Sequence, residues 1–161
     1  MAVEMFLDID GVKGESQAKD FKDKIDIFSF SLGASNPSSV ATGAGSGAGK
    51  VSISSISVQK IVDSATGELF LACCKGKHYK KAKLTVREAG GDKPVEYMVL
   101  DFEQVFVDSI SWGAASGGEK PSESVSFSFA KIQVDYKMQD EKGIGKSVGL
   151  AKWDLQKNTS A

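Results

Sequence analysis

Apolar and polar residues alternate with a period of two through most of this 161-residue chain. In segment 3–9, every second residue is valine, methionine, leucine or isoleucine. Successive side chains of a β-strand point to opposite faces, so this spacing is typical of half-buried strands. Related patterns occupy segments 25–32, 51–62, 82–88, 95–107, 122–136 and 150–155. We therefore predict a mainly β protein of about eight antiparallel strands.

One segment breaks this period and has helical spacing instead. Its apolar positions are Leu69, Phe70, Cys73 and Cys74. They form one stripe on a helix, which Asp63 or Ser64 can cap at its start. Gly76 is a natural C-terminal stop, because glycine readily adopts the left-handed conformation. The pattern predicts one α-helix at about 64–75.

Several of the expected strands change their apolar phase along their length. Segments 51–62 and 122–136 switch faces part-way, which is typical of a bulge or a barrel corner. Segment 95–107 has large apolar residues on both faces, so neither face can be freely solvated. We predict a curled antiparallel β-barrel, folded as one domain over 1–161. A core of this size needs no disulfide or metal.

A glycine- and serine-rich stretch at about 33–49 is predicted to be a long loop, because it has too few apolar residues to fold alone. Within it, Gly43–Lys50 looks like a phosphate-binding loop. The Walker pattern fails, because Val51 follows Lys50 where serine or threonine is needed. The glycines also match a dinucleotide pattern, but both motifs require a following helix, and a strand is expected here. We therefore predict a flexible loop or an interaction arm.

The overall composition excludes several classes of function. The net charge of −1 and the pI of about 5.9 give no general attraction to nucleic acid or to an anionic membrane. The adjacent Cys73 and Cys74 are not spaced as a disulfide framework, and His78 is the only histidine. A metal site or a catalytic pair would need more such residues. We predict no enzyme activity, no cofactor and no metal.

A basic segment follows the expected helix, formed by Lys75, Lys77, Lys80, Lys81 and Lys83. We predict a basic turn containing His78, followed by a strand from about residue 82. Three interpretations remain open: nucleic-acid binding through the phosphates, a solvated rim, or a contact with acidic residues of a neighbouring subunit. Acidic residues available for the third interpretation are Asp101, Glu103, Asp140 and Glu141.

The first ten residues contain acidic side chains within their apolar run and lack a basic start. They are therefore not a secretory signal peptide, and no window reaches the length of a membrane span. We predict synthesis in the cytoplasm. Export would need a route that reads no cleaved signal.

Several short motifs occur in an order that resembles one known family. They are Met1–Phe6, Val12–Ser16, Gly47–Val51, Gly76–Tyr79, Ala82–Arg87 with Ala89–Gly91, Val95–Tyr97 and Phe129–Tyr136. Each is weak alone, but their order and spacing over nearly the whole chain resemble the haemolysin-coregulated protein (Hcp) family, which builds the inner tube of the bacterial type VI secretion machine.

The resemblance implies a β-barrel with one helix, similar to phage tail tube proteins. It implies a structural subunit whose hexameric rings stack into a tube inside contractile sheath proteins, under a valine-glycine-repeat spike protein. Sheath contraction would expel the tube, and the ring lumen would carry and protect small effector proteins. Such a subunit is assembled in the cytoplasm and secreted to the extracellular space or a target cell. No effector domain is expected after residue 157.

The site residues expected on this basis fall into two groups. Strand alternation places Ser29 and Ser31 on a small polar face, which we expect to line the lumen. Contacts between rings or subunits are expected at Gly43, Gly45, Gly47, Gly49, Lys50, Lys77, His78 and Tyr79. The alternative function is a stand-alone monomeric β-barrel that binds a small molecule or carbohydrate, which would need an aromatic-lined pocket.

Overall fold

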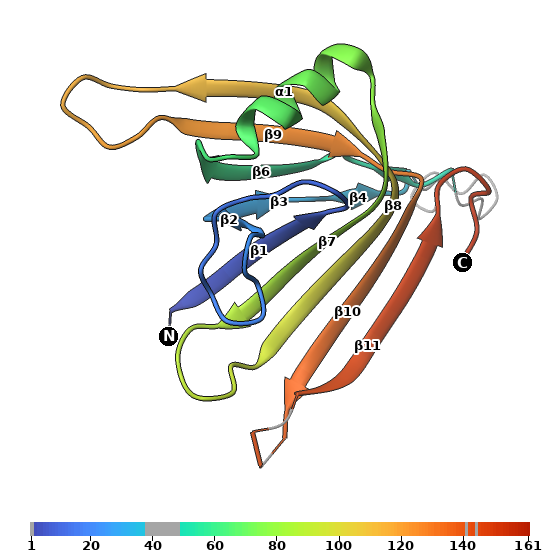
Figure 1. Ribbon diagram of the computed structural model, residues 1–161. Coiled ribbons are helices and arrows are strands. Elements are labelled where there is room, and N and C mark those ends of the chain that lie inside the picture. The colour runs from blue at the N-terminus through green and yellow to red at the C-terminus, as the bar shows by residue number, and fades with distance from the viewer. Residues whose placement is uncertain (1, 38–48, 141, 144) are drawn as a thin grey trace.

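A long strand, β8 (Glu96–Gly113), organises the fold, because it pairs with three other strands (Figure 1). The computed structural model describes residues 2–37, 49–140, 142–143 and 145–161. The other elements are β1 (Val3–Ile9), β2 (Ile25–Ile27), β3 (Ser29–Ser31), β4 (Ala34–Ser35), β5 (Ser52–Ile53), β6 (Ile56–Ile61), α1 (Thr66–Lys75), β7 (His78–Glu88), β9 (Ser122–Ser128), β10 (Lys131–Gln139) and β11 (Gly145–Asp154).

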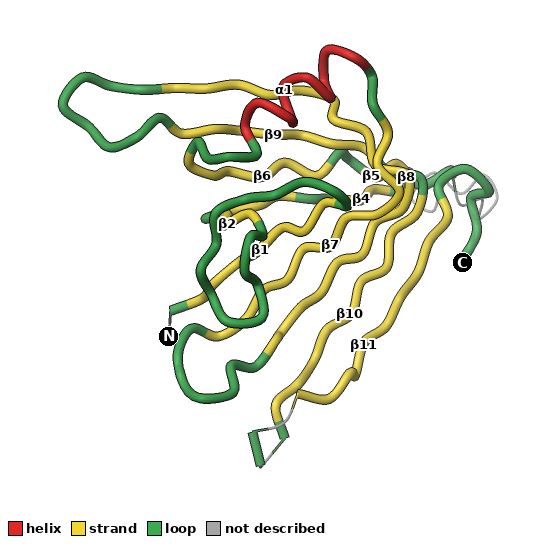
Figure 2. The backbone as a smooth tube through the Cα atoms, in the orientation of Figure 1, coloured by secondary structure: helices red, strands yellow, loops and turns green. Residues whose placement is uncertain are grey.

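The main sheet is antiparallel and curls back on itself. Its strands follow the order β2-β1-β7-β8-β9-β6-β3. Only Phe28 separates β2 from β3, so segment 25–31 pairs with β1 at one end and with β6 at the other. This continuity closes the sheet into the predicted barrel. β10 pairs with the first half of β8, and β11 pairs with β10, so these two strands extend from the barrel as a hairpin (Figure 2).

β8 changes partners at Gln104, which has a left-handed φ of 54°. Before it, β8 lies between β7 and β10; after it, β9 replaces β10, and β7 remains a partner as far as Phe106. Leu100 and Phe102 are buried before this point, and Val105 and Val107 after it. The conformation at Gln104 therefore shifts the alternation by one residue. The sequence pattern placed Leu100 and Phe102 on one face of this strand and Val105 and Val107 on the other. In the structure, all four side chains pack into one core.

That core fills the barrel and extends beneath the helix. Leu84 and Leu100 are cross-strand partners, and both side chains are fully buried. Val58 and Phe127, which belong to the other half of the sheet, are also fully buried. The ring of Phe102 meets Phe127 edge to face, with centroids 5.8 Å apart. Both halves of β8 thus share one apolar interior.

The outer face of β1 is covered by the polar segment 11–24, which the sequence pattern did not predict. Phe21 from this segment stacks on Phe6 with centroids 4.3 Å apart. The guanidinium of Arg87 lies 4.9 Å from each ring and donates a hydrogen bond from Nε to Glu4 at 2.9 Å. Aromatic stacking and the cation therefore cover a face that alternation alone would expose.

The helix packs mainly against β8, and its first turn is joined by side chains to β6 and β9. It starts at Thr66, two residues later than predicted, and ends before Gly76, whose φ of 66° confirms the predicted stop. Under its first turn, the buried ammonium of Lys60 pairs with Glu123 and with Asp63. The hydroxyl of Thr66 donates to the same Glu123 carboxylate at 2.9 Å. This network joins the start of the helix to both strands.

Several predicted boundaries were wrong. Segment 51–62 is two strands separated by Ser54 and Ser55, and segment 122–136 is two strands separated by Phe129 and Ala130. Each phase change is a break between two strands rather than a bulge within one strand. At the first break the partner β4 is replaced by β3 and β9, and at the second β6 is replaced by β11 while β8 remains a partner. The predicted strand 25–32 is likewise interrupted at Phe28: Ile25 and Ile27 are buried before it, and Phe30 packs on the core after it.

Other elements start earlier or extend further than predicted. β7 begins at His78 rather than at 82, so the basic turn contains only two residues before the strand. The adjacent Lys80 and Lys81 hide the alternation there. β11 starts at 145 rather than 150, and β4 lies within the predicted loop 33–49.

Candidate functional site

Ser29 and Ser31 lie on β3 with exposed side chains, whereas Phe30 between them packs against the core. The register of the sheet extends this polar surface well beyond the two serines. Ser29 is opposite Gln59 of β6, and Ser31 is opposite Ser57. These two positions therefore begin cross-strand rows that run over several strands.

The two rows cross four strands, β3, β6, β9 and β8, which lie side by side in Figure 1. The first row is Ser29, Gln59, Ser124 and Ser111, and the second is Ser31, Ser57, Ser126 and Ser109. We call these eight residues the serine face. It comprises seven hydroxyls and one amide, and none of its members is charged or buried.

Strict alternation produces this face. In β9, Ser124 and Ser126 point outward, while Glu123, Val125 and Phe127 are fully buried beneath them. The amide of Gln59 donates to the hydroxyl of Ser124 at 2.8 Å, which links neighbouring strands. The apolar underside holds the polar surface in place, so its geometry is set by the core.

Asp108 lies at the margin of the serine face, at the register shift between Val107 and Ser109. Its carboxylate accepts hydrogen bonds from the hydroxyls of Ser55 and Ser128, the latter at 3.0 Å. The acid is thus bound by serines of the same chain. It joins the segment between β5 and β6 to β8 and β9.

A surface of this kind can donate and accept hydrogen bonds in many directions, because each hydroxyl rotates freely. None of its eight members is charged, and the carboxylate at its margin, that of Asp108, is hydrogen-bonded to serines of the same chain. Sequence reasoning found Ser29 and Ser31 but missed the six other members. The signal was present as Ser-x-Ser-x-Ser-x-Ser over 122–128, which alternates in the same way.

The residues predicted for the loop contact are only partly described. Gly43, Gly45 and Gly47 lie outside the described residues. Gly49 donates its backbone N–H to the carbonyl of Pro37 at 3.0 Å, and Lys50 is exposed beside it. A Cβ on Gly49 would lie only 2.8 Å from Pro37, so this close approach requires glycine.

The predicted contact residues Lys77, His78 and Tyr79 do not share one surface. The ring of His78 lies 5.1 Å from that of Phe106 at an exposed position. Tyr79 is buried, and this burial raises the pKa of its hydroxyl, with a further rise from the charge of Glu68. Lys77 lies 4.8 Å from the Tyr79 ring and 3.6 Å from Glu68. Lys77 and His78 are thus accessible, whereas Tyr79 belongs to the core.

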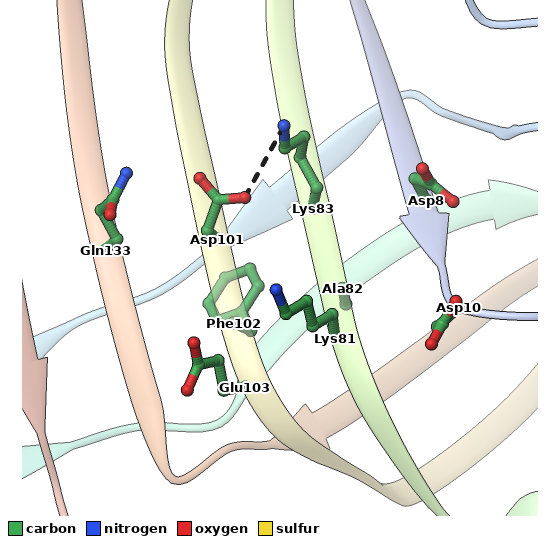
Figure 3. Close-up of a pocket in the computed structure, with 9 residues that line it drawn as sticks. All are labelled: Asp8, Asp10, Lys81, Ala82, Lys83, Asp101, Phe102, Glu103 and Gln133. Carbon is green, nitrogen blue, oxygen red and sulfur yellow. Dashed lines mark ion pairs between the residues drawn. The ribbon is translucent and has the colours of Figure 1, made fainter.

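The first half of β8 presents a different outer surface, shown in Figure 3. Asp8, Lys83 and Asp101 are cross-strand neighbours, and the ammonium of Lys83 lies 3.8 Å from Asp101. A second row places Lys81, Glu103 and Lys131 in register. We call these six residues the charged face. All of them except Lys131 line an open hollow of about 520 Å³.

The charged face bears on the three interpretations of the basic segment. The structure gives Lys83 and Lys77 acidic partners in their own chain, Asp101 and Glu68. These contacts fit a solvated rim of paired charges. Asp140 follows the end of β10, and Glu141 lies outside the described residues. Among the residues that are described, no three His, Cys, Asp or Glu side chains gather as a metal site.

In the described part of the chain, no helix is long and apolar enough to cross a membrane.

Comparison with known proteins identifies the family. The family model for the type VI secretion system effector Hcp matches residues 6–136. The chain belongs to the Hcp family. It is 42% identical over 163 positions to protein hcp1 of Pseudomonas aeruginosa, and the match covers all of both chains. These findings confirm the resemblance inferred from the short motifs.

Solved structures agree with this assignment. One, of a type six secretion system protein, has a TM-score of 0.92 and 28% identity, over 99% of this chain and 100% of that one. Hcp1 of Salmonella typhimurium has a TM-score of 0.80 and 28% identity, over all of both chains. Hcp is a family of secreted, self-associating structural proteins of type VI secretion, not a family of enzymes. The chain is therefore a type VI secretion tube protein.

Proposed function

We propose that the chain, folded as one domain over 1–161, forms hexameric rings that stack into the inner tube of a type VI secretion machine. The serine face lines the lumen of each ring and contacts the proteins that the tube carries. The observation that carries this proposal is the continuous neutral surface over β3, β6, β9 and β8. Ser29 and Ser31 lie at one edge of it.

The chemistry of the two outer faces supports this placement. A channel that passes proteins of varied charge benefits from walls without strong electrostatic traps, because unpaired charges bind the opposite sign strongly. Hydroxyls give weak, replaceable hydrogen bonds. The charged face, whose cations lie beside acids of the same chain, suits a solvated position. The hollow beside it is lined mainly by charged groups, whereas the alternative, a carbohydrate-binding barrel, needs exposed aromatic rings.

The wider assembly follows from the same proposal. The subunit is made and assembled in the cytoplasm, surrounded by contractile sheath proteins and capped by a valine-glycine-repeat spike protein. Contraction expels the tube with effectors protected in its lumen, without a cleaved signal peptide. The loop that contains Gly43–Lys50 contacts the adjacent ring, and the accessible Lys77 and His78 lie at a contact between subunits.

The test combines negative-stain electron microscopy with site-specific gold labelling. In a Cys73→Ser, Cys74→Ser background, Ser31→Cys is labelled with a maleimide-linked gold cluster. Uniform rings with gold density in the central hole are expected. Lys83→Cys on the charged face is the matched control, and its gold should lie outside the hole. Monomers instead of rings would overturn the assembly and favour the ligand-binding alternative, whereas rings with Ser31 gold on the rim would overturn the lumen assignment alone.

A further inference from the structure

The serine face continues for one more row, and this row carries a charge. Ile56 of β6 is opposite Phe127 of β9, and both are buried. The next position along this register is Ser55 opposite Ser128, and alternation puts both side chains on the outer face. Each of these two hydroxyls donates a hydrogen bond to the carboxylate of Asp108. The acid therefore lies over a third row of the same surface.

Asp108 reaches this position through a bulge in β8. The register between β8 and β9 shifts between Val107 and Ser109, so Asp108 is an extra residue between them. Val107 points into the core, Ser109 belongs to the serine face, and Asp108 is exposed. Bulges re-aim side chains and are common beside functional sites. This one adds a single acid to an otherwise neutral surface.

The carboxylate of Asp108 is held in place, but its charge is not paired. One oxygen accepts the hydroxyl of Ser55, and the other accepts that of Ser128. In the described part of the chain Asp108 has no basic partner, whereas Asp101 on the charged face lies 3.8 Å from Lys83. A carboxylate can accept about four hydrogen bonds, so about two positions remain for a ligand. An acceptor that is already ordered loses little conformational entropy on binding.

The surroundings of Asp108 determine which groups it can attract. The eight members of the serine face are uncharged, so none of them neutralises this acid or competes with it. Salt screens exposed charges beyond about 8 Å at physiological ionic strength, so Asp108 acts on groups in direct contact. Carboxylates bind ammonium and guanidinium groups through charge-assisted hydrogen bonds. Lysine and arginine side chains are therefore the groups that fit this position.

We propose that Asp108 gives the lumen a preference for cargo proteins with a basic surface. A lysine or arginine of the cargo binds the carboxylate, and the serine rows contact the neutral polar surface around it. This inference rests on the proposed lumen and names the chemistry of its occupant. Each copy in a ring contributes one such carboxylate, so these acids lie at one level of the bore. Rings of acidic side chains favour cationic groups in pores.

The experiment measures binding of two fluorescent peptides to assembled rings by anisotropy. One peptide alternates lysine with serine, and the other has glutamate in place of lysine. Rings of the unchanged chain should bind the lysine peptide more tightly, and added salt should weaken this binding. Asp108→Asn keeps the shape of the side chain and should weaken binding of the lysine peptide about tenfold. The matched control is Asp101→Asn, which removes one charge from the charged face and should have little effect.

A charge reversal makes the test sharper. Rings of Asp108→Lys should bind the glutamate peptide more tightly than the lysine peptide. Native mass spectrometry and circular dichroism verify assembly and folding of each variant. If rings of the unchanged chain show no preference for the lysine peptide, or if Asp108→Asn binds it as the Asp101→Asn control does, this inference is overturned and the ring stands. If the unchanged chain is monomeric, the proposed ring fails and this inference fails with it.

Discussion

The two halves of β8 carry outer surfaces of opposite character. Before Gln104, the sheet presents the charged face, in which Lys83 lies between Asp8 and Asp101. After Gln104, it presents the serine face, whose eight members are uncharged. One strand therefore contributes to two surfaces, and the change of surface coincides with the change of partner strands.

The comparison extends to what lies beneath each surface. Under the charged face, the interior contains apolar residues such as Leu84 and Leu100. Near the end of the serine face, beneath β6 and β9, it contains the buried pair of Lys60 and Glu123. Charge is thus outside in one half and inside in the other. The serine face is neutral because side chains alternate along β9: Ser124 points outward, and the adjacent Glu123 points inward.

The largest effect is expected from Lys60→Met. Removing the ammonium leaves the Glu123 carboxylate buried with the Thr66 hydroxyl as its remaining partner. Losing one member of a buried ion pair costs about 3–5 kcal/mol of unfolding free energy. Urea unfolding at neutral pH measures this loss.

A second variant makes this prediction specific. Lys60→Met combined with Glu123→Met removes both charges, and its stability should return to within about 1–2 kcal/mol of the unchanged chain. If the double variant is as unstable as the single one, packing rather than the unpaired carboxylate explains the loss. The buried charges of Lys60 and Glu123 would then not be an energetic difference between the two halves of β8.

The next effect concerns Gln104, where the two halves meet. Its φ of 54° is unfavourable for a residue with a side chain and worst for a β-branched one. Gln104→Val should lower the unfolding free energy by about 1–3 kcal/mol. Gln104→Gly should be neutral or slightly stabilising, because glycine adopts this conformation readily. Equal losses for both variants in urea unfolding would show that the Gln104 side chain, and not its backbone, holds the joint.

The third effect tests whether the charged face is only a solvated rim. Lys83 and Asp101 are both more than a third exposed, so their coupling should be about 0.2–1 kcal/mol. A double-mutant cycle with Lys83→Gln and Asp101→Asn measures it. The coupling should shrink in 1 M salt, where screening reaches roughly 3 Å. A larger, salt-resistant coupling would assign this face a structural role.

Alternation over 3–9, the helix stop at Gly76 and the order of family motifs were enough to predict the barrel class and the family. The breaks were harder, because a phase change looks the same whether a strand bulges or ends. At Phe129 and Ala130 the chain leaves β6 and passes from the second half of β8 to its first half, where Lys131 is opposite Glu103. Local pattern contains no information about such partners.

The serine face shows the same limit. Ser29 and Ser31 could be selected by alternation on one strand, but their rows depend on the register of three further strands. Tyr79 was predicted as a contact residue, yet it is buried, because β7 starts earlier than the lysines suggest. Sequence reasoning therefore found two members of the serine face, and tertiary pairing determined the extent of that face.

The smallest effect concerns Tyr79, which is opposite Val105 at the junction of the two halves. Burial, reinforced by Glu68, raises its pKa above the ordinary value of 10.0. The unfolded chain then ionises first, so the contribution of this group is fully present below pH 10.0 and is lost as the pH rises above it. Tyr79→Phe should remove this part of the alkaline loss. Urea unfolding from about pH 9 to 11 tests this, with the half-exposed Tyr136→Phe as control. If the unfolding free energies of the unchanged chain and of Tyr79→Phe fall in parallel over this pH range, ionisation of Tyr79 does not contribute to the alkaline loss at the junction.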